Sequence, residues 1–447
     1  MRPLTKKIQL VNPPIPGFSS LELVKNYFAP LGLLSIATCL SSKMPSVEVE
    51  ILDGSILTLG EIKRRLEAEI VGISTNSFNY PSALKIAQTA KKKGAKVVLG
   101  GVHASFLPVN ILRNREYLDA IVVGDGEESM VDYVQGKPFS EIKNLVYRDE
   151  EKKIRMNEVA NVDLSKLPVI ERKFLDQSLY FEAFQKDYPN LPYKKPIAIY
   201  SQKGCPWRDK TGGCVFCGRM DKGFRMRSPK QVWEEIEYLV KSYEVDLVWD
   251  VADCFTTSKD WLSAFLASKP KHLNPLFMVF ARADELDEER VKILKEINCY
   301  RVILGVESGD ENVLKRSQKG TTLQQILSSA KLLEEFRINT WPSFVLGLPG
   351  ESEKSLKNTY SLAKFLSSLK NAEALTVSVL IPFPGSKAFA FMLRMPKLAE
   401  KYLGRDLFDL EELQKDWVRY FCHADFACLK EYQEKMLRLV PHGTRLI

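Results

Sequence analysis

The chain has 447 residues, which is enough for two or three domains with apolar cores. Its hydrophobic content of 45% and charged content of 27% are ordinary for a globular protein. The net charge of +8 comes from scattered basic residues, which argues against a nucleic-acid partner but permits an anionic substrate or cofactor. No run approaches the roughly 20 apolar residues of a membrane span, and the opening residues do not resemble a secretory signal. We therefore expect a cytoplasmic protein with reduced cysteines.

Residues 1–140 alternate between apolar runs and helical patterns. The predicted helices lie near 31–42, 60–69 and 81–94, and the predicted strands are 6–12, 47–53, 69–76, 96–101 and 120–126. Strands separated by helices predict an α/β domain with a doubly wound parallel sheet of the flavodoxin or Rossmann type. Such sheets bind ligands at the carboxyl ends of their strands.

The carboxyl ends of these predicted strands are rich in glycine and small polar residues. Glycine allows the backbone to approach a large flat ligand closely, although sheets of this type also need glycine at their turns. The candidate ligand-binding residues are Asn12, Pro13, Ser74, Thr75, Asn76, Gly100, Gly101, Val102, His103, Gly124, Asp125, Gly126 and Glu127.

A weaker pattern, predicted to be a linker with a hairpin, occupies 141–195. Strand–helix alternation then resumes, with predicted strands at 196–202, 246–253, 276–282, 300–308, 339–350 and 374–385. Six βα units indicate a partial TIM-like barrel over 196–387, whose chemistry should lie at the carboxyl ends of its strands. The remaining region, 388–447, is predicted to be helical and contains no recognisable motif.

Three of the eight cysteines lie close together, directly after the first barrel strand. Eight residues separate Cys205 from Cys214, and two separate Cys214 from Cys217. In a reducing compartment this spacing favours a metal over a disulfide. Three thiolates leave a four-iron cluster one protein ligand short, and they leave zinc needing a fourth ligand such as Cys254 or a histidine. The spacing favours iron–sulfur and leaves zinc open.

The barrel region resembles the radical S-adenosylmethionine superfamily over 196–387. The similarity rests on the cysteine loop and on "VADCFT", "ARADELDEE", "LGVESGDENVLKRSQKGTT", "FVLGLPGESEKS" and "LIPFPGSK". In that superfamily three residues usually separate the first two cysteines, so the gap of eight is a departure. The resemblance implies a [4Fe-4S] cluster held by Cys205, Cys214 and Cys217, with an open iron that chelates S-adenosylmethionine.

The resemblance also implies roles for residues at the strand ends. Phe216 would pack near the adenine, Asp253 and Arg282 near the methionyl group, and Glu307 and Ser308 beside the ribose or amino group. Gly347 and Gly350 would allow the adenosyl group to pack directly against the backbone. For Glu307 and Arg282, an interior salt bridge is the alternative interpretation.

Residues 6–140 resemble the cobalamin-binding domain that precedes the barrel in one large subfamily. The similarity rests on "VGIST", "VVLGGVHAS" and "VVGDGEES". No Asp-x-His-x-x-Gly motif follows the first strand, so a corrinoid ligated by that histidine is not expected. His103 could face the corrin or make a structural hydrogen bond.

Together the resemblances imply a cobalamin-dependent radical enzyme. The most favoured activity is methylation of an unactivated carbon, through hydrogen abstraction by a 5′-deoxyadenosyl radical and methyl donation by methylcobalamin. The alternatives are a non-methylating cyclisation, rearrangement or C–C bond formation, and a corrinoid- or zinc-binding scaffold. A methylthiolating tRNA enzyme is disfavoured, because the first 200 residues contain only Cys39. Expected partners are a small-molecule, lipid or peptide substrate and a reductant protein such as flavodoxin or ferredoxin.

Overall fold

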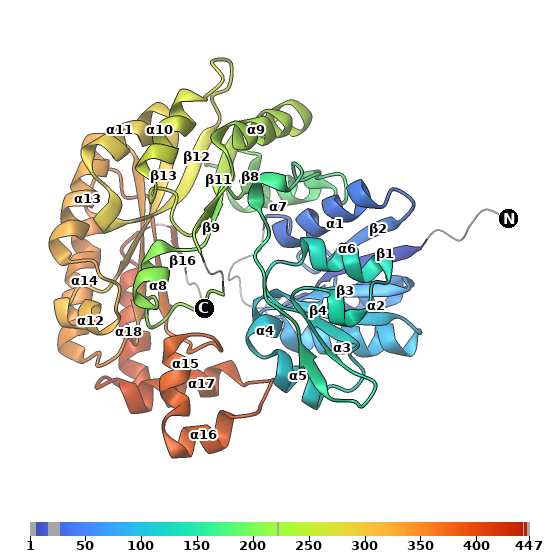
Figure 1. Cartoon of the computed structure of the whole chain (residues 1–447). Helices are drawn as coiled ribbons and strands as arrows, with labels where there is room; N and C mark the ends of the chain where they lie inside the picture. Colours follow the sequence, from blue (N-terminus) through green and yellow to red (C-terminus); the bar gives the residue numbers. More distant parts are fainter. Residues whose placement is uncertain (1–5, 17–26, 221–222, 441, 445–447) are drawn as a thin grey trace. The chain divides into compact units, whose positions relative to one another are not determined.

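The computed structural model describes residues 6–16, 27–220, 223–440 and 442–444, and these fold as two compact units (Figure 1). The first unit comprises Met1–Pro189, Arg219–Asp221 and Leu393–Phe408, and the second comprises Asn190–Gly218, Lys222–Met392 and Asp409–Ile447. The C-terminal region is thus divided, because one of its segments returns to the N-terminal unit.

The first unit is built on one twisted sheet. Its strands are β1 (Lys7–Asn12), β2 (Glu48–Asp53), β3 (Ile70–Ser74), β4 (Lys96–Gly100), β5 (Ala120–Val122), β6 (Leu145–Arg148) and β7 (Ile154–Met156), in the order β2-β1-β3-β4-β5-β6-β7. The first five are parallel, and β6 and β7 add the predicted antiparallel hairpin. The order 2-1-3-4-5 confirms a flavodoxin-like sheet. The last parallel strand is shorter than predicted, because the chain turns at Gly124, where φ is +75°.

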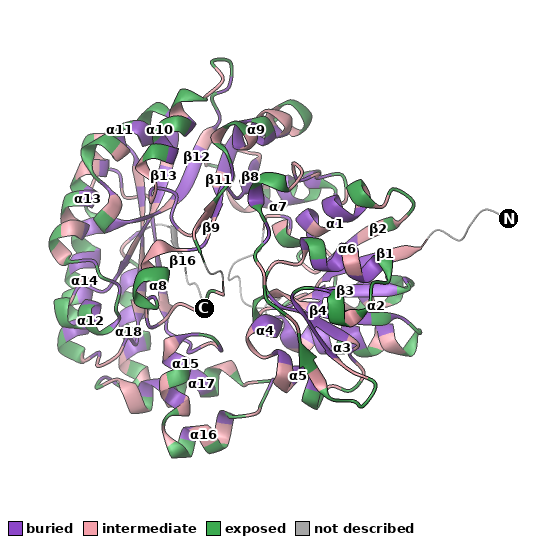
Figure 2. Ribbon diagram, viewed as in Figure 1, coloured by how far each residue is buried: buried purple, intermediate pink, exposed green. Residues whose placement is uncertain are grey.

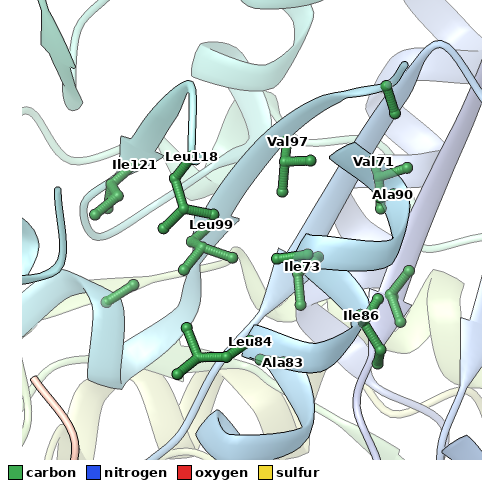
Figure 3. Close-up of a cluster of buried hydrophobic side chains, with 14 of the residues drawn as sticks. Val71, Ile73, Ala83, Leu84, Ile86, Ala90, Val97, Leu99, Leu118 and Ile121 are labelled. Carbon is green, nitrogen blue, oxygen red and sulfur yellow. The ribbon is translucent and has the colours of Figure 1, made fainter. Parts of the chain in front are cut away.

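Helices cover the sheet of the first unit. They are α1 (Leu31–Lys43), α2 (Leu59–Arg65), α3 (Tyr80–Lys92), α4 (Gly101–Phe106), α5 (Pro108–Asn114) and α6 (Glu127–Gln135), with α7 (Gln177–Asp187) in the linker. The α3 helix buries Tyr80, Ala83 and Ala87, which recur every three to four residues. They pack in one apolar cluster with the alternate side chains Val71 and Ile73 of β3 (Figure 3). The apolar runs of the central strands are continuous because both faces of this sheet are covered.

The second unit is a curled half-barrel. Its strands are β8 (Pro196–Ile199), β11 (Leu247–Asp250), β12 (Leu276–Arg282), β13 (Cys299–Glu307), β14 (Asn339–Leu346), β15 (Ala374–Val379) and β16 (His442–Thr444), which are all parallel and neighbour one another in this order. The first six confirm the predicted strands. The seventh strand, β16, was not predicted. It follows four helices, and its three residues are too few to show the alternating pattern of a strand.

The outer face of the half-barrel is covered by helices. These are α9 (Pro229–Tyr243), α10 (Lys259–Ala267), α11 (Glu288–Glu296), α12 (Glu311–Arg316), α13 (Leu323–Glu335) and α14 (Glu353–Ser367). Residues of β14 alternate along the strand between buried and half-buried, while the helices around the half-barrel carry exposed residues (Figure 2). The inner face therefore remains partly accessible while the outer face is sealed.

The C-terminal region is helical, as predicted. It contains α15 (Lys387–Leu393), α16 (Pro396–Tyr402), α17 (Leu410–Phe421) and α18 (Phe426–Leu437). In the second unit, side-chain amides of α17 and α18 bond to strand backbone: Gln414 Nε2 donates to Val379 O at 2.7 Å, and Gln433 Nε2 donates to Val377 O at 2.8 Å. Among the described residues, no helix is long and apolar enough to cross a bilayer.

Candidate functional site

The cysteine loop leaves the half-barrel after β8. Short antiparallel strands, β9 (Gln202–Lys203) and β10 (Arg225–Met226), close its base. The eight residues between Cys205 and Cys214 include a short helix, α8 (Pro206–Thr211), for which Cys205 is the N-cap residue. Gly212 and Gly213 follow with φ of +77° and +83°, a backbone conformation that glycine adopts without strain. The unusual cysteine spacing is thus a helical insertion that ends in a glycine turn.

Helix α8 is fixed against the half-barrel through Trp207. Its Nε1 donates to Gln318 O at 2.8 Å, and its ring lies 5.0 Å from the guanidinium of Arg282. A Cβ added at Gly320 would lie 2.2 Å from the indole, so only glycine allows this approach. Lys387 Nζ donates to Gly213 O at 2.7 Å from the start of α15. The loop is therefore held from both sides.

The charges around the cysteines suit thiolate ligands. All three thiols are half-buried, and Cys217 N donates to Cys214 O at 3.2 Å. Burial raises the pKa of the Cys214 thiol to about 11, while the nearby cations Lys319 and Arg282 act to lower it. Such cations offset the negative charge that thiolates bring to a cluster. This donor set fits the implied iron–sulfur cluster. Within the described ranges, no three His, Cys, Asp or Glu side chains are arranged to hold a single metal ion.

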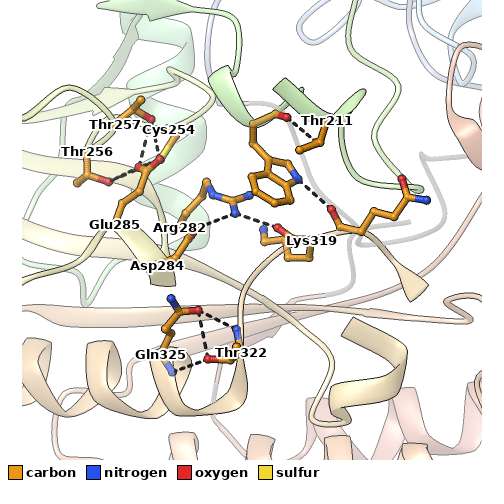
Figure 4. Close-up of polar contacts among 12 residues, drawn as sticks. Thr211, Cys254, Thr256, Thr257, Arg282, Asp284, Glu285, Lys319, Thr322 and Gln325 are labelled. Carbon is orange, nitrogen blue, oxygen red and sulfur yellow. Dashed lines mark hydrogen bonds and ion pairs between the residues drawn. The ribbon is translucent and has the colours of Figure 1, made fainter. Parts of the chain in front are cut away.

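Two predicted site residues at the strand ends are paired with protein groups, and Figure 4 shows the contacts of one of them, Arg282. Arg282 Nη2 donates to Asp284 Oδ2 at 2.9 Å and to Lys319 O at 2.8 Å. Glu307, which has φ of +64°, accepts from Lys319 Nζ at 2.7 Å in a buried ion pair. The interior salt bridges considered from sequence are therefore present, and the S-adenosylmethionine contacts of Arg282 and Glu307 stay predictions.

Ser308 is fully buried and points toward α14. Its Oγ lies 3.2 Å from Thr359 Oγ1 and accepts from Asp310 N at 3.2 Å. Phe216 and Asp253 are half-buried. Their predicted contacts with S-adenosylmethionine remain to be tested.

The turn after β14 is fixed by groups that the sequence did not reveal. Glu351 Oε2 accepts from Gly347 N at 2.6 Å and Leu348 N at 3.3 Å, while Trp417 Nε1 of α17 donates to Gly347 O at 2.7 Å. Gly350 N donates to Phe421 O at 2.7 Å. Burial raises the pKa of Glu351 to about 8. The helical tail thus holds the turn that contains both predicted adenosyl-binding glycines.

Two buried polar atoms at the carboxyl ends of β8 and β11, Gln202 Oε1 and Asp250 Oδ2, have no hydrogen-bond partner within 3.5 Å among the described residues. The other Asp250 oxygen accepts from Ser201 N at 3.2 Å and Ala252 N at 3.0 Å. Burial raises the pKa of Asp250 to about 6, while the Ser201 side chain, which lies beside the Asp250 carboxyl, acts to lower that pKa. Because buried polar atoms in native proteins are normally hydrogen-bonded, this end of the half-barrel fits a polar ligand such as S-adenosylmethionine.

In the first unit, the carboxyl ends of β3, β4 and β5 form a glycine-lined edge. A Cβ added at Gly124 would meet no heavy atom within 4 Å, and one at Gly100 would meet only Val122 O, at 3.7 Å. Gly101 has φ of +84° and approaches the Thr75 backbone, where a Cβ would lie 2.5 Å away. Val102 is 49% exposed at this edge. The open space and the exposed apolar side chain fit one face of a large planar group such as cobalamin.

Other predicted residues of this edge stabilise the loops themselves. Thr75 Oγ1 donates to Gly100 O at 2.7 Å and accepts from Ala104 N at 3.1 Å. Asn76 Oδ1 accepts from Phe78 N and Asn79 N, each at 2.9 Å. These side chains fix the backbone on which a ligand would rest. Three further predicted residues lie at the strand ends. Pro13 is buried, Ser74 is half-buried, and Gly126 is the N-cap residue of α6.

Three more predicted residues have carboxyl groups or carboxylate partners. Asn12 Nδ2 donates to Asp53 Oδ1 at 2.7 Å, and Glu127 accepts from Ser35 Oγ at 2.8 Å in the interior. Asp125 Oδ2 accepts from Val162 N at 3.1 Å. These contacts tie the strand ends to α1 and to the linker.

His103 makes the structural hydrogen bonds considered from sequence. Its Nε2 donates to Asp406 O at 2.8 Å, so its Nδ1 accepts from Ser77 Oγ at 3.0 Å. The centroid of the His103 ring lies 4.2 Å from that of the Tyr80 ring, and burial lowers the His103 pKa to about 4. The ring is therefore neutral, and both nitrogens have protein partners.

Asp406, at the end of the C-terminal segment of this unit, was not recognised from sequence. Its carboxylate accepts from Tyr80 OH at 2.7 Å, Asn114 Nδ2 at 2.9 Å and Arg115 Nε at 2.8 Å. It is 3% exposed. No local pattern could reveal it, because its partners lie about 300 residues earlier in the chain.

Comparisons with known proteins agree with this architecture. A B12 binding domain model matches residues 21–134, and a radical SAM superfamily model matches 199–363. An uncharacterized methyltransferase of Pyrococcus horikoshii is 27% identical over 407 residues, which cover 87% of this chain and 83% of the relative. The anaerobic magnesium-protoporphyrin IX monomethyl ester cyclase of Rubrivivax gelatinosus is 27% identical over 314 residues, which cover 67% of this chain and 54% of the cyclase.

A solved structure shares the fold. The radical S-adenosylmethionine methyltransferase TsrM of Kitasatospora setae, with cobalamin and a [4Fe-4S] cluster bound, superposes with a TM-score of 0.68 at 19% identity, covering 86% of this chain and 74% of that one. The chain therefore contains a B12-binding domain and a radical S-adenosylmethionine domain. These two domains imply a [4Fe-4S] cluster, S-adenosylmethionine and cobalamin as cofactors.

Proposed function

We propose that this enzyme is a C-methyltransferase that methylates an unactivated carbon of its substrate. The observation that carries the proposal is the three-cysteine loop at the carboxyl end of the first half-barrel strand, in a chain that also contains a B12-binding unit. A methyltransferase relative that matches most of both chains supports it. When bound, the cofactors would supply reductive cleavage of S-adenosylmethionine and a transferable methyl group.

The residues of the half-barrel would bind and orient these groups. Cys205, Cys214 and Cys217 would hold the cluster, and the cations Lys319 and Arg282 would offset its negative charge. The buried atoms Gln202 Oε1 and Asp250 Oδ2 would hydrogen-bond the polar groups of S-adenosylmethionine. The turn that begins at Gly347, fixed by Glu351 and Trp417, would receive the adenosyl group against backbone.

The first unit would hold cobalamin at its strand ends. Gly100 and Gly124 would leave room for the corrin edge, while Gly101 lies against the Thr75 backbone and Thr75 fixes the loop behind that edge. His103 would act through the loop and not as a cobalt ligand, because both of its ring nitrogens have protein partners.

A second candidate is a non-methylating cyclisation, and the specific observation in its favour is the similarity to the magnesium-protoporphyrin ester cyclase. The two candidates differ in their products. Methylation produces S-adenosylhomocysteine and 5′-deoxyadenosine together, whereas cyclisation produces 5′-deoxyadenosine without stoichiometric S-adenosylhomocysteine. We retain a small molecule as the substrate class, a one-electron reductant protein as partner and the cytoplasm as location within this proposal.

The test is cofactor content and product analysis after anaerobic purification from cells supplied with cobalamin. We expect about four irons and one corrinoid per chain, and S-adenosylmethionine cleavage driven by dithionite. Cys205→Ala, Cys214→Ala and Cys217→Ala should each lose cluster iron and cleavage. Cys428→Ala is the matched control, since this half-buried thiol lies outside the loop, on α18. Zinc in place of iron, or cleavage that survives in the three loop variants, would refute the assignment.

A further inference from the structure

The cysteine loop is strongly basic compared with the rest of the chain. Between residues 203 and 230 there are eight Lys and Arg against two Asp, in a protein whose net charge is +8. Part of this charge is used internally, since Arg227 forms a buried ion pair with Glu235. The remaining basic residues need another explanation.

On helix α8 the basic charge is directed outward. Lys210 is exposed and has no carboxylate partner among the described residues. Lys387 lies beside the end of α8, where its Nζ contacts the carbonyls of Gly213 and Thr211, at 2.7 and 3.3 Å. Its charge is therefore compensated by dipoles and not by an anion. Asp209 is the one acidic residue of α8.

A second basic group adjoins α8 through the segment that follows α12. Gln318 contacts both Trp207 and Lys387, and its N–H donates to Lys315 O at 3.1 Å. Lys315 is exposed at the last turn of α12 and, among the described residues, has no ion-pair partner. Lys210 and Lys315 are thus exposed on two neighbouring segments that Lys387 and Gln318 connect, and we call the exposed side of these segments the α8 surface.

The α8 surface is rigid and lies next to the cluster ligands. Cys205 begins α8, and Cys214 follows the two glycines that end it. The Trp207 contacts with Gln318 and Gly320 fix the helix to the half-barrel. A protein bound here would approach the cluster without a rearrangement of the loop.

We propose that the α8 surface is the docking site for an acidic one-electron donor protein that reduces the cluster. This inference rests on the proposed function, because it assumes a cluster that must receive electrons from outside. Charge complementarity selects the partner, because lysines without carboxylate partners among the described residues raise the local concentration and the association rate of an acidic protein. The chemistry is the transfer of one electron from the donor's reduced cofactor to the oxidised cluster, with no bond formed or broken.

The test compares two charge-reversal pairs in the anaerobically purified holoenzyme. Lys210→Glu with Lys315→Glu changes the α8 surface. Lys292→Glu with Lys364→Glu makes the same change in net charge on exposed lysines of α11 and α14. Each enzyme is reduced either by reduced flavodoxin, as an acidic donor, or by dithionite. The rate of cluster bleaching and the yield of 5′-deoxyadenosine are measured at low and high salt.

We expect the α8 pair to slow reduction by flavodoxin at least about tenfold at low salt, with the difference shrinking at high salt as charges are screened. Reduction by dithionite should be unchanged, and the α11/α14 pair should behave as wild type. Equal rates for the two pairs, or an equal loss in both, would overturn the docking site while dithionite-driven cleavage still supports the proposed function. Wild type without dithionite-driven cleavage would overturn the proposed function, and the docking site with it.

Discussion

Glu351 offers a direct test of how the turn after β14 is stabilised. The carboxyl group is fully buried, and one oxygen accepts from two turn amides while Oε1 has no hydrogen-bond partner. Burial raises its pKa from 4.5 to about 8. At pH 6 the folded protein therefore holds a proton on Glu351 that the unfolded chain releases.

The pH dependence has a definite sign. Between pH 4.5 and 8 the native state binds more protons than the unfolded state, so the free energy of unfolding falls as pH rises. The difference between pKa values of 4.5 and about 8 corresponds to at most about 5 kcal/mol, lost progressively up to pH 8. Below pH 4.5 the group is neutral in both states and has no such effect.

Glu351→Gln mimics the protonated acid at every pH. At pH 5 we expect this variant to be about 1–3 kcal/mol less stable than wild type, because its amide N–H groups lie where Oε1 has no partner. At pH 9 it should be the more stable protein, because wild type then carries a buried charge. Urea unfolding of both proteins from pH 5 to 9 measures the pH at which their free energies of unfolding are equal.

The matched control is Glu353→Gln, since Glu353 is exposed, pairs with Lys357 and has a lowered pKa. Its effect on stability should not vary between pH 5 and 9. A difference between Glu351→Gln and wild type that is constant over this range would show that the buried carboxyl does not titrate there, and the reasoning would fail.

Three further outcomes follow from other buried contacts. Lys319→Met should lower the free energy of unfolding by about 3–5 kcal/mol, because it leaves the Glu307 charge unpaired. Adding Glu307→Gln should restore most of this stability. Urea unfolding that shows no restoration would contradict the pairing. Asp406→Ala should cost about 2–4 kcal/mol, since it leaves Arg115 and a buried tyrosine hydroxyl without their acceptor, and unchanged thermal unfolding of the first unit would exclude this role. Trp417→Phe should cost about 1–3 kcal/mol by removing the donor to the turn carbonyl. Calorimetry of this variant should also show weaker S-adenosylmethionine binding. An unchanged affinity would contradict a role of the turn in binding that ligand.

Sequence patterns were sufficient to predict the parallel strands of both sheets, except β16. Strand and helix periods are local properties, and apolar runs bounded by glycine locate strands without knowledge of their neighbours. The three cysteines were also readable, because all of them lie on one loop. Motif resemblance supplied the cofactors, and the domain comparisons agree with it.

The long-range contacts that stabilise the candidate sites could not be predicted from sequence and were found only in the folded structure. The Asp406 carboxylate reaches Tyr80, 326 residues away, and Trp417 reaches Gly347 from 70 residues away. Strand β16 has three residues and joins the sheet after four helices. Such contacts leave no periodic trace, because each depends on one side chain that meets a distant backbone or charge. The half-barrel and the glycine-lined edge follow from patterns, whereas the groups that fix their loops follow from packing.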